Sequence, residues 1–247
     1  MKRYGLIGFP LSHSFSEAYF KKKFEVEQIN DCSYQNFPLE NISEFPSLVN
    51  SNPALKGLNV TIPYKEKVIP FLSEADDIVN DIQACNCISI SNKRFTGFNT
   101  DVAGFRITLE EQLKPYHSSA LILGEGGAAK AVAYVLRNLG IDYRHVVRTR
   151  KSPRQILFSE LNESAIAESL LIVNTTPVGT SPNVHESPIQ DFASIGPSHY
   201  LYDLIYNPFK TLFLQNGEKR GAAIKNGLAM LEIQAEESWK IWIKSAL

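Results

Sequence analysis

Hydrophobic and polar positions along the first hundred residues predict an α/β unit. Residues 4–8 form a short apolar run that a Gly-Phe-Pro turn closes, and residues 16–24 have helical spacing with charged side chains on the outer face. Further apolar runs at 55–62 and 85–90 predict strands, and the intervening segment 65–82 carries a helical pattern. Alternation of strands and helices in this order indicates a layered α/β domain.

A second α/β unit follows. Residues 119–124 form an apolar strand, 128–139 a helix that stops at Gly140, and 143–148 a second strand. This order predicts a βαβ unit with parallel strands and a right-handed crossover. Two later apolar runs, at 170–174 and 200–206, predict further strands of the same sheet.

The last predicted helix covers about residues 227–243 and is expected to pack back on the first domain. Its residues for burial are Leu228, Leu231, Ile233, Trp239 and Trp242. No repeat, low-complexity tract or long charge run marks a linker, so the boundaries come from patterning alone. They place residues 1–101 with 226–247 in one domain and residues 102–225 in the other.

Composition narrows the class of protein. The chain has 247 residues, 44% of them apolar, and 25 basic against 26 acidic side chains. The apolar content excludes disorder as the main state, and the net charge of −1 gives no global field for nucleic acid or an acidic membrane surface. No stretch approaches the roughly 20 apolar residues of a membrane span, and we expect a cytoplasmic protein. The spacing of Cys85 and Cys87 suits neither a disulfide framework nor a zinc site, so buried thiols and no metal are expected.

A glycine-rich segment lies between the first strand and the helix of the second unit. Gly124-Glu125-Gly126-Gly127-Ala128-Ala129 satisfies G-x-G-x-x-G/A, which binds a dinucleotide in this context. The glycines allow the backbone to approach a pyrophosphate, and the helix N-terminus offers free N–H groups to the anion. The alternative is a simple tight turn between strand and helix.

The residues at the end of the next predicted strand favour NADP over NAD. An NAD site usually has a carboxylate there to bind the ribose 2′-hydroxyl, whereas this chain has Arg148-Thr149-Arg150-Lys151, with Arg154 beyond. A guanidinium suits a 2′-phosphate because it makes forked, charge-assisted hydrogen bonds. The alternative is a solvated basic loop.

Polar clusters follow the predicted strands of the first unit. They are His13-Ser14-Phe15-Ser16, residues 59–65 ending in Lys65, Asn86, and Gly97-Phe98-Asn99-Thr100-Asp101. Each is ambiguous alone: the serines could cap a helix, Asn86 could hold a turn, and Lys65 could be a surface lysine.

Taken together, the order and spacing of these motifs resemble the shikimate dehydrogenase family over nearly the whole chain. The matching segments are residues 8–16, 59–65, 84–86, 99–104, 124–131, 174–179, 203–208 and 227–235. The resemblance implies an N-terminal α/β substrate domain, a C-terminal Rossmann-type NADP domain, and an active site in the cleft between them. It implies reversible reduction of 3-dehydroshikimate to shikimate, in chorismate and aromatic amino-acid biosynthesis, by a monomer or homodimer whose partner is this small molecule.

The resemblance also assigns residues. Lys65 and Asp101 would be the catalytic pair. Substrate-binding residues would be Ser14, Ser16, Thr61, Lys65, Asn86, Asp101, Tyr206 and Gln234. Cofactor-binding residues would be Asp77, Gly124, Glu125, Gly126, Gly127, Ala128, Arg148, Thr149, Arg150, Leu204 and Gly227. The catalytic choice is chemically sound, because hydride delivery to a ketone develops alkoxide charge that a nearby ammonium can stabilise and protonate.

Several positions depart from the family pattern. Glu17 replaces a usual proline, Cys85 and Cys87 stand where valine and threonine are common, and Val147 replaces an asparagine. Glu125 replaces a small residue inside the glycine loop, and its carboxylate would weaken cofactor binding unless it points to solvent.

Three other interpretations of the chain stay open. The first is a quinate/shikimate dehydrogenase that uses NAD. The second is a catalytically silent sensor of shikimate-like acids, which retention of Lys65 and Asp101 disfavours. The third is a different two-domain dinucleotide enzyme that shares only the glycine loop.

Overall fold

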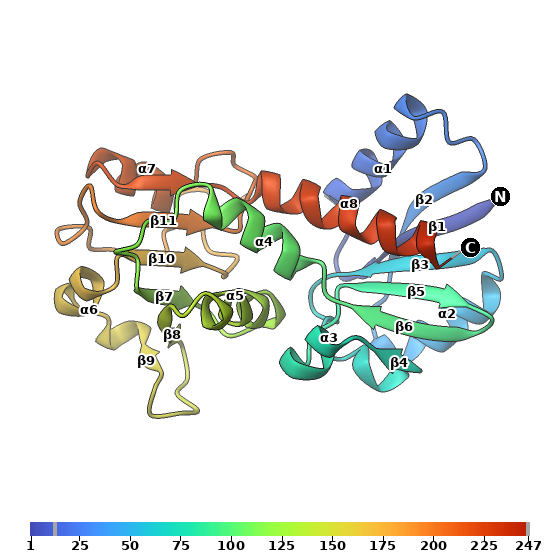
Figure 1. Ribbon diagram of the computed structural model, residues 1–247, viewed down its shortest axis with the longest axis horizontal. Coiled ribbons are helices and arrows are strands. Elements are labelled where there is room, and N and C mark those ends of the chain that lie inside the picture. The colour runs from blue at the N-terminus through green and yellow to red at the C-terminus, as the bar shows by residue number, and fades with distance from the viewer. Residues whose placement is uncertain (12–13, 246–247) are drawn as a thin grey trace. The chain divides into compact units, whose positions relative to one another are not determined.

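The computed structural model describes residues 1–11 and 14–245 (Figure 1). The chain forms two compact units, Met1–Thr100 with Gln234–Leu247 and Asp101–Ile233. The first unit is therefore discontinuous in sequence, and the second is inserted within it.

The first unit contains a six-stranded sheet in the order β2-β1-β3-β5-β6-β4 (Figure 1). Its strands are β1 (Lys2–Gly8), β2 (Cys32–Pro38), β3 (Leu55–Val60), β4 (Glu74–Ala75), β5 (Cys87–Ser91) and β6 (Arg94–Phe98). Strands β1, β2 and β3 are parallel, whereas β5 runs antiparallel to both β3 and β6. The C-terminal ends of β3 and β6 and the start of β5 therefore lie at one edge of the sheet.

Helices α1 (Phe15–Val26) and α8 (Leu228–Lys244) pack on a core that includes β1 and β2. Tyr4 stacks on Trp242 with ring centroids 4.9 Å apart, and Phe20 stacks on Tyr34 at 4.4 Å. A second core, around Phe45 of α2 (Phe45–Ser51), packs against β1, β3 and β5. The prediction that the last helix packs on the first domain is confirmed by these contacts.

The predicted helix over residues 65–82 is wrong. This segment forms turns, a 3-10 helix at Ile69–Phe71, strand β4, and only then α3 (Asp77–Ile82). Pro70 lacks the N–H that a continuous helix needs, and the Asp76 side chain caps α3 by accepting from the Val79 N–H at 2.8 Å. Val68 and Val79 are both buried, so these apolar positions do face the core, but they do not belong to one helix.

The second unit has a six-stranded parallel sheet in the order β12-β11-β10-β7-β8-β9. Its strands are β7 (Ser119–Leu123), β8 (Asp142–Val147), β9 (Ile156–Leu157), β10 (Leu171–Asn174), β11 (Tyr200–Asp203) and β12 (Ala223–Lys225). Its helices are α4 (Asp101–Glu110), α5 (Gly127–Asn138), α6 (Glu163–Glu168) and α7 (Leu212–Lys219). The predicted β7-α5-β8 unit with parallel strands is confirmed, whereas the strand predicted over 200–206 ends at Asp203.

The strand order of this sheet reverses at β7, which pairs with β8 on one side and β10 on the other. In open parallel sheets, a ligand binds at the C-terminal ends of the strands where the order reverses. The glycine-rich segment begins directly after β7. Among the described residues, no helix is long and apolar enough to cross a membrane.

Candidate functional site

A chain of buried polar side chains joins the sheet of the first unit to α8. The Tyr34 hydroxyl donates to Asn59 Oδ1 at 2.9 Å, and Asn59 Nδ2 donates to Ser238 Oγ at 2.9 Å. Ser238 Oγ lies 3.2 Å from Thr100 Oγ1. Buried polar groups are rarely left without partners, and these satisfy one another.

Asn86 and Gln234, two predicted substrate-binding residues, meet at the end of this chain. Asn86 Nδ2 donates to Gln234 Oε1 at 3.4 Å and to Thr100 Oγ1 at 3.0 Å, and Asn86 Oδ1 accepts from the Thr100 N–H at 2.7 Å. Both amides are buried, with exposed fractions of 2% and 7%. The structure therefore brings together two of the proposed residues that lie 148 positions apart in sequence.

Ser14 and Ser16 lie at the start of α1. Ser14 occupies the N-cap position but makes no capping hydrogen bond, and its buried Oγ has no partner among the described residues. The Ser14 side chain therefore does not cap α1, and its role as a substrate-binding residue stays a prediction. Burial raises the pKa of Tyr34 well above its usual value, although a hydrogen bond with the Ser16 side chain opposes the rise. His13 lies outside the described residues.

Thr61 and Lys65 follow β3, at the same sheet edge as Asn86. The Thr61 N–H donates to the Ile7 carbonyl at 2.9 Å, and the Lys65 carbonyl accepts from the Cys85 N–H at 2.7 Å. These backbone contacts hold the Thr61–Lys65 turn between the end of β1 and the start of β5.

Asp101 is the first residue of α4 and is only 5% exposed. It directly follows Thr100, whose backbone is fixed by Asn86. Asp101 belongs to the second unit and Lys65 to the first, so the catalytic pairing of these two residues stays a prediction.

The glycine-rich segment of the second unit has a backbone that only glycine tolerates at its first position. Gly124 has a φ of +113°, and a Cβ there would lie 2.7 Å from Thr175 Oγ1. Thr175 Oγ1 donates to the Leu123 carbonyl at 2.6 Å, and His145 Nδ1 lies 2.8 Å from the Gly124 carbonyl oxygen. Residues from β8 and from the end of β10 thus hold the turn in place.

The start of α5 fits a bound pyrophosphate. Gly126 is the N-cap residue and Gly127 the first residue of the helix, followed by Ala128. A Cβ at Gly126 would meet no atom within 4 Å, so the space in front of the helix N-terminus is open. Free N–H groups and open space at a helix N-terminus suit an anion.

The basic residues of the loop after β8 differ in their ion-pair partners. The Arg150 guanidinium pairs with Glu160, and Lys151 Nζ pairs with Glu125 Oε1 at 2.8 Å. Arg148 is exposed and has no ion pair within the described part of the chain. Thr149 lies between the two arginines, directly beyond β8.

The remaining predicted cofactor residues lie in three places. Asp77 begins α3 of the first unit. Leu204 and Gly227 belong to the second unit, where the Gly227 N–H donates to the Ile205 carbonyl at 3.0 Å and a Cβ at Gly227 would lie 2.0 Å from the Leu204 carbonyl oxygen. Glycine is therefore required at position 227, because a larger residue would clash with the Leu204 carbonyl. Tyr206 lies in the bend that follows Leu204.

Asp203 organises this bend and was not singled out from the sequence. Its carboxylate accepts from Thr211 Oγ1 at 2.6 Å, from Asn174 Nδ2 at 3.0 Å and from the Ile205 N–H at 3.0 Å. Burial raises its pKa to about 6, although these hydrogen bonds act against the rise. Asn174 and Asp203 share one local signal that could have found them, because each is a polar residue at the last position of an apolar strand.

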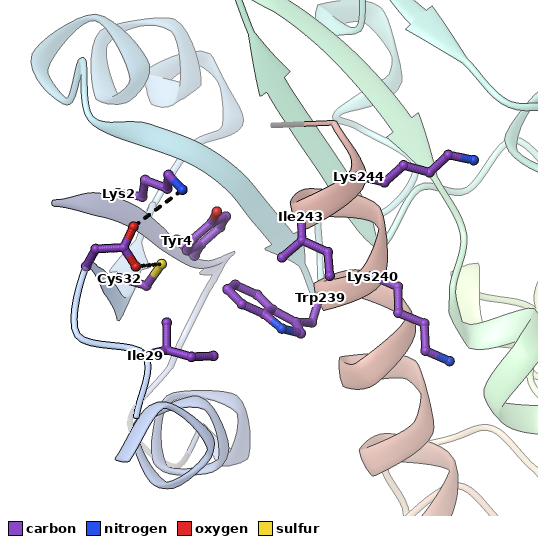
Figure 2. A pocket seen from close by; sticks show the side chains of 9 residues that line it. Lys2, Tyr4, Ile29, Cys32, Trp239, Lys240, Ile243 and Lys244 are labelled. Carbon is purple, nitrogen blue, oxygen red and sulfur yellow. Dashed lines mark hydrogen bonds and ion pairs between the residues drawn. The ribbon is translucent and has the colours of Figure 1, made fainter. Parts of the chain in front are cut away.

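A cavity of about 500 Å³ lies elsewhere in the first unit (Figure 2). Tyr4 and Trp239 form its aromatic wall, and Lys2 at its rim pairs with Asp31 at 3.4 Å. None of the predicted site residues lines it. Within residues 1–11 and 14–245, no group of three or more histidine, cysteine, aspartate or glutamate side chains could hold a metal ion. Cys85 and Cys87 are buried free thiols, as predicted, whereas Cys32 is only partly buried.

A parallel sheet with a glycine-rich turn at its switch point is typical of a dinucleotide-binding domain. Here it is joined to a second α/β unit, an organisation found in two-domain dinucleotide-dependent dehydrogenases. Residues 6–88 match the family model of the shikimate dehydrogenase substrate binding domain. The chain belongs to the shikimate dehydrogenase family, as its motifs predicted.

Similar proteins cover nearly the full length. The NADP(+) shikimate dehydrogenase of Caldicellulosiruptor saccharolyticus is 38% identical, over 98% of this chain and 92% of the relative, and that of Desulforamulus reducens is 34% identical, over 96% and 88%. The shikimate dehydrogenase structure from Aquifex aeolicus has a TM-score of 0.86 at 32% identity, covering 98% of this chain and 92% of that one. The Thermus thermophilus enzyme in complex with NADP(H) and shikimate has a TM-score of 0.86 at 29% identity, covering 99% and 94%.

Proposed function

We propose that this chain catalyses the reversible NADPH-dependent reduction of 3-dehydroshikimate to shikimate, a step of chorismate and aromatic amino-acid biosynthesis. The observation that carries the proposal is the full-length similarity to NADP(+) shikimate dehydrogenases, at up to 38% identity among those compared. The same proposal places the enzyme in the cytoplasm, as a monomer or homodimer.

In the proposed mechanism, bound NADPH supplies the hydride, and the chain stabilises the oxygen that becomes negative. The Lys65 ammonium faces the developing alkoxide, lowers its energy and donates the proton that completes the alcohol. The Asp101 carboxylate accepts a hydrogen bond from a substrate hydroxyl. In the oxidative direction, Lys65 takes the proton back.

Short hydroxyl and amide side chains would bind the substrate carboxylate and hydroxyls. These are Ser14, Ser16, Thr61, Asn86, Tyr206 and Gln234. The unpaired Oγ of Ser14 and the Asn86–Gln234 contact support this role. Such a site selects a polyol acid, because an analogue that lacks one hydroxyl leaves a buried polar group unpaired.

The second unit would bind the cofactor at the C-terminal ends of its strands. The start of α5 would bind the pyrophosphate, and Arg148, Thr149 and Arg150 would surround the 2′-phosphate. Leu204 and Gly227, with Asp77 of the first unit, would complete the site.

The test is oxidation of shikimate and of quinate, each with NADP⁺ and with NAD⁺, followed by the absorbance of the reduced nicotinamide. We expect the highest kcat/KM for shikimate with NADP⁺. A quinate dehydrogenase from Corynebacterium glutamicum in complex with NAD has a TM-score of 0.85 to this chain at 25% identity, so preference for quinate and NAD⁺ is the main competing result. Binding of shikimate without turnover would instead identify a sensor.

A further inference from the structure

The loop that follows β8 is closed by the side chain of Gln155. Its Oε1 accepts from the Lys151 N–H at 2.6 Å and from the Ser152 N–H at 3.1 Å. The Gln155 N–H in turn donates to the Ser152 carbonyl at 3.1 Å. One neutral amide thus sets the shape of a loop that starts at Arg148.

The same side chain ties this loop to the glycine-rich turn. Gln155 Nε2 donates to Glu125 Oε2 at 3.3 Å, and Lys151 Nζ donates to Glu125 Oε1 at 2.8 Å. Both carboxylate oxygens of Glu125 are therefore bound by the basic loop. Because Glu125 stands between Gly124 and Gly126, these contacts join the turn proposed for the pyrophosphate to the loop proposed for the 2′-phosphate.

Lys151 also compensates the negative charge of Glu125. An unpaired carboxylate at this position would repel a pyrophosphate, whereas the ion pair brings the local charge to zero. The unusual residue of the glycine-rich segment is thus an anchor for the neighbouring loop.

The basic residues of the loop differ in whether they form an ion pair. Arg150 is held by Glu160 and Lys151 by Glu125. Within the described residues, Arg148 and Arg154 carry no ion pair and can bind an anionic ligand without losing a partner, whereas Arg150 would share its guanidinium with Glu160. An exposed arginine binds a phosphate more tightly when its backbone is already fixed, because less conformational freedom is lost on binding.

We propose that Gln155 is a positioning residue for cofactor selection: anchored on Glu125, it fixes the loop from which Arg148 binds the 2′-phosphate of NADPH. The proposal rests on the proposed use of NADP. Because Gln155 is neutral, it acts through the geometry of the loop and contributes no charge to the attraction of the phosphate.

The experiment measures the dissociation constants of NADPH and NADH for the full chain by titration of nicotinamide fluorescence. Gln155→Ala is expected to weaken NADPH binding about fivefold, the size typical of one unfixed side chain, and NADH binding less than about twofold. The kcat at saturating NADPH is expected to stay unchanged. Gln190→Ala is the matched control, because its amide also holds a loop of the second unit, by donating to the Ser187 carbonyl at 2.9 Å, and we expect it to change neither constant.

A second pair of variants tests whether Glu125 acts as a hydrogen-bond acceptor for the loop or through its negative charge. Glu125→Gln keeps an acceptor for the loop and should preserve the ratio of the two dissociation constants, whereas Glu125→Ala should lower the NADPH preference as Gln155→Ala does. In the Glu125→Ala background, Gln155→Ala should lower the NADPH preference less than it does in the parent, since the Gln155–Glu125 contact is already gone and only the contacts to Lys151 and Ser152 are left to lose.

Equal weakening of both cofactors by Gln155→Ala, or no weakening, overturns the proposal. If the parent prefers NADPH and the Gln155→Ala variant keeps the same preference, the role of Gln155 is rejected and the proposed use of NADP is not. A parent that prefers NADH rejects the proposed cofactor as well.

Discussion

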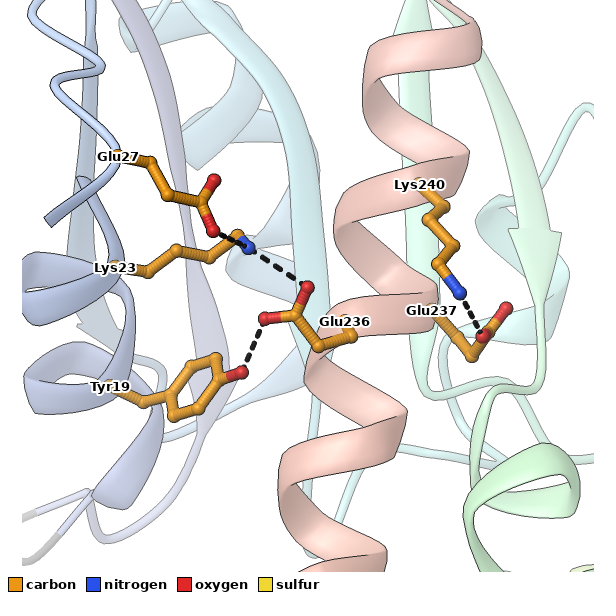
Figure 3. Close-up of polar contacts among 6 residues, drawn as sticks. All are labelled: Tyr19, Lys23, Glu27, Glu236, Glu237 and Lys240. Carbon is orange, nitrogen blue, oxygen red and sulfur yellow. Dashed lines mark hydrogen bonds and ion pairs between the residues drawn. The ribbon is translucent and has the colours of Figure 1, made fainter. Parts of the chain in front are cut away.

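Glu236 of α8 forms an ion pair with Lys23 of α1, with 2.8 Å between Oε2 and Nζ (Figure 3). The Tyr19 hydroxyl donates to the other oxygen of the same carboxylate, and Lys23 also binds Glu27, the residue that caps the C-terminus of α1, at 2.6 Å. Helix α1 begins beside Ser14, and Gln234 precedes Glu236 by two residues. One carboxylate therefore fixes the two helices that carry these predicted substrate residues.

This carboxylate should make stability depend on pH. Burial alone would raise the pKa of Glu236, but the hydrogen bonds from Lys23 and Tyr19 outweigh it, so the pKa lies below its usual value. A carboxylate with a lowered pKa stabilises the fold above its unfolded-state pKa, and this stabilisation is lost as pH falls through the folded-state pKa. We expect Glu236→Gln to lower the free energy of unfolding by about 1 kcal/mol at neutral pH, with the difference shrinking below about pH 4. Urea denaturation across this range measures it.

The control for this prediction is Glu237→Gln. Glu237 pairs with Lys240 on the same helix at 2.8 Å and does not reach α1 in the contacts drawn (Figure 3). We expect this variant to change stability by only a few tenths of a kcal/mol. Similar losses in the two variants would mean that Glu236 does not join the helices energetically.

Replacing Lys65 should affect turnover more than binding. Lys65→Ala is expected to lower kcat by roughly a hundredfold, the size typical for loss of an acid/base group, while shikimate still binds. Steady-state kinetics and a direct shikimate titration measure the two effects. Lys67→Ala, an exposed lysine two residues away, is the matched control, and a variant at Lys65 that turns over like the parent would exclude this residue from the mechanism.

Replacing Gln234 should affect the substrate more than the cofactor. Gln234→Ala removes the amide that contacts Asn86, and we expect the KM for shikimate to rise roughly tenfold with little change in the KM for NADP⁺. Gln215→Ala, whose amide donates to the Lys210 carbonyl at 2.9 Å, should leave both values unchanged. A larger change in the KM for NADP⁺ than for shikimate would contradict the assignment.

Replacing Arg148 should distinguish the two dinucleotides. We expect Arg148→Ala to weaken NADPH binding by about 1.5–3 kcal/mol, the range for a hydrogen bond to a charged group, and to leave NADH binding nearly unchanged. Arg220→Ala, at the end of α7, controls for loss of one positive charge from the second unit. Equal weakening of both dinucleotides would show that Arg148 serves the pyrophosphate or the fold.

Local patterns predicted the elements that contain strong apolar periodicity. The β7-α5-β8 unit is such a case, because β7 is apolar throughout after Ser119, the helix ends close to Gly140, and β8 ends in two buried valines. Strands β2 and β6 were missed because polar residues interrupt them, which suits strands near the edge of a sheet.

The polar network of the first unit shows the limit of such patterns. The resemblance to a known family pointed to Asn86 and Gln234, but nothing local indicated that Asn59 donates to Ser238, 179 residues away. Both are buried polar side chains, and only the packing of α8 on the sheet brings them together. Gln155 was missed for a related reason, since its function lies in contacts to backbone groups and to Glu125.

The packing of Trp242 against Tyr4 also determines when the first unit can become complete during synthesis. The ribosome releases β1 and α1 before the second unit, yet the rings that cover their apolar face belong to α8, which follows that unit. The whole of residues 101–233 is made in between and forms its own core. Because domains generally fold as units while the chain is made, the inserted dinucleotide unit is expected to fold before the unit that encloses it in sequence, whose nascent apolar face stays uncovered until α8 has been made.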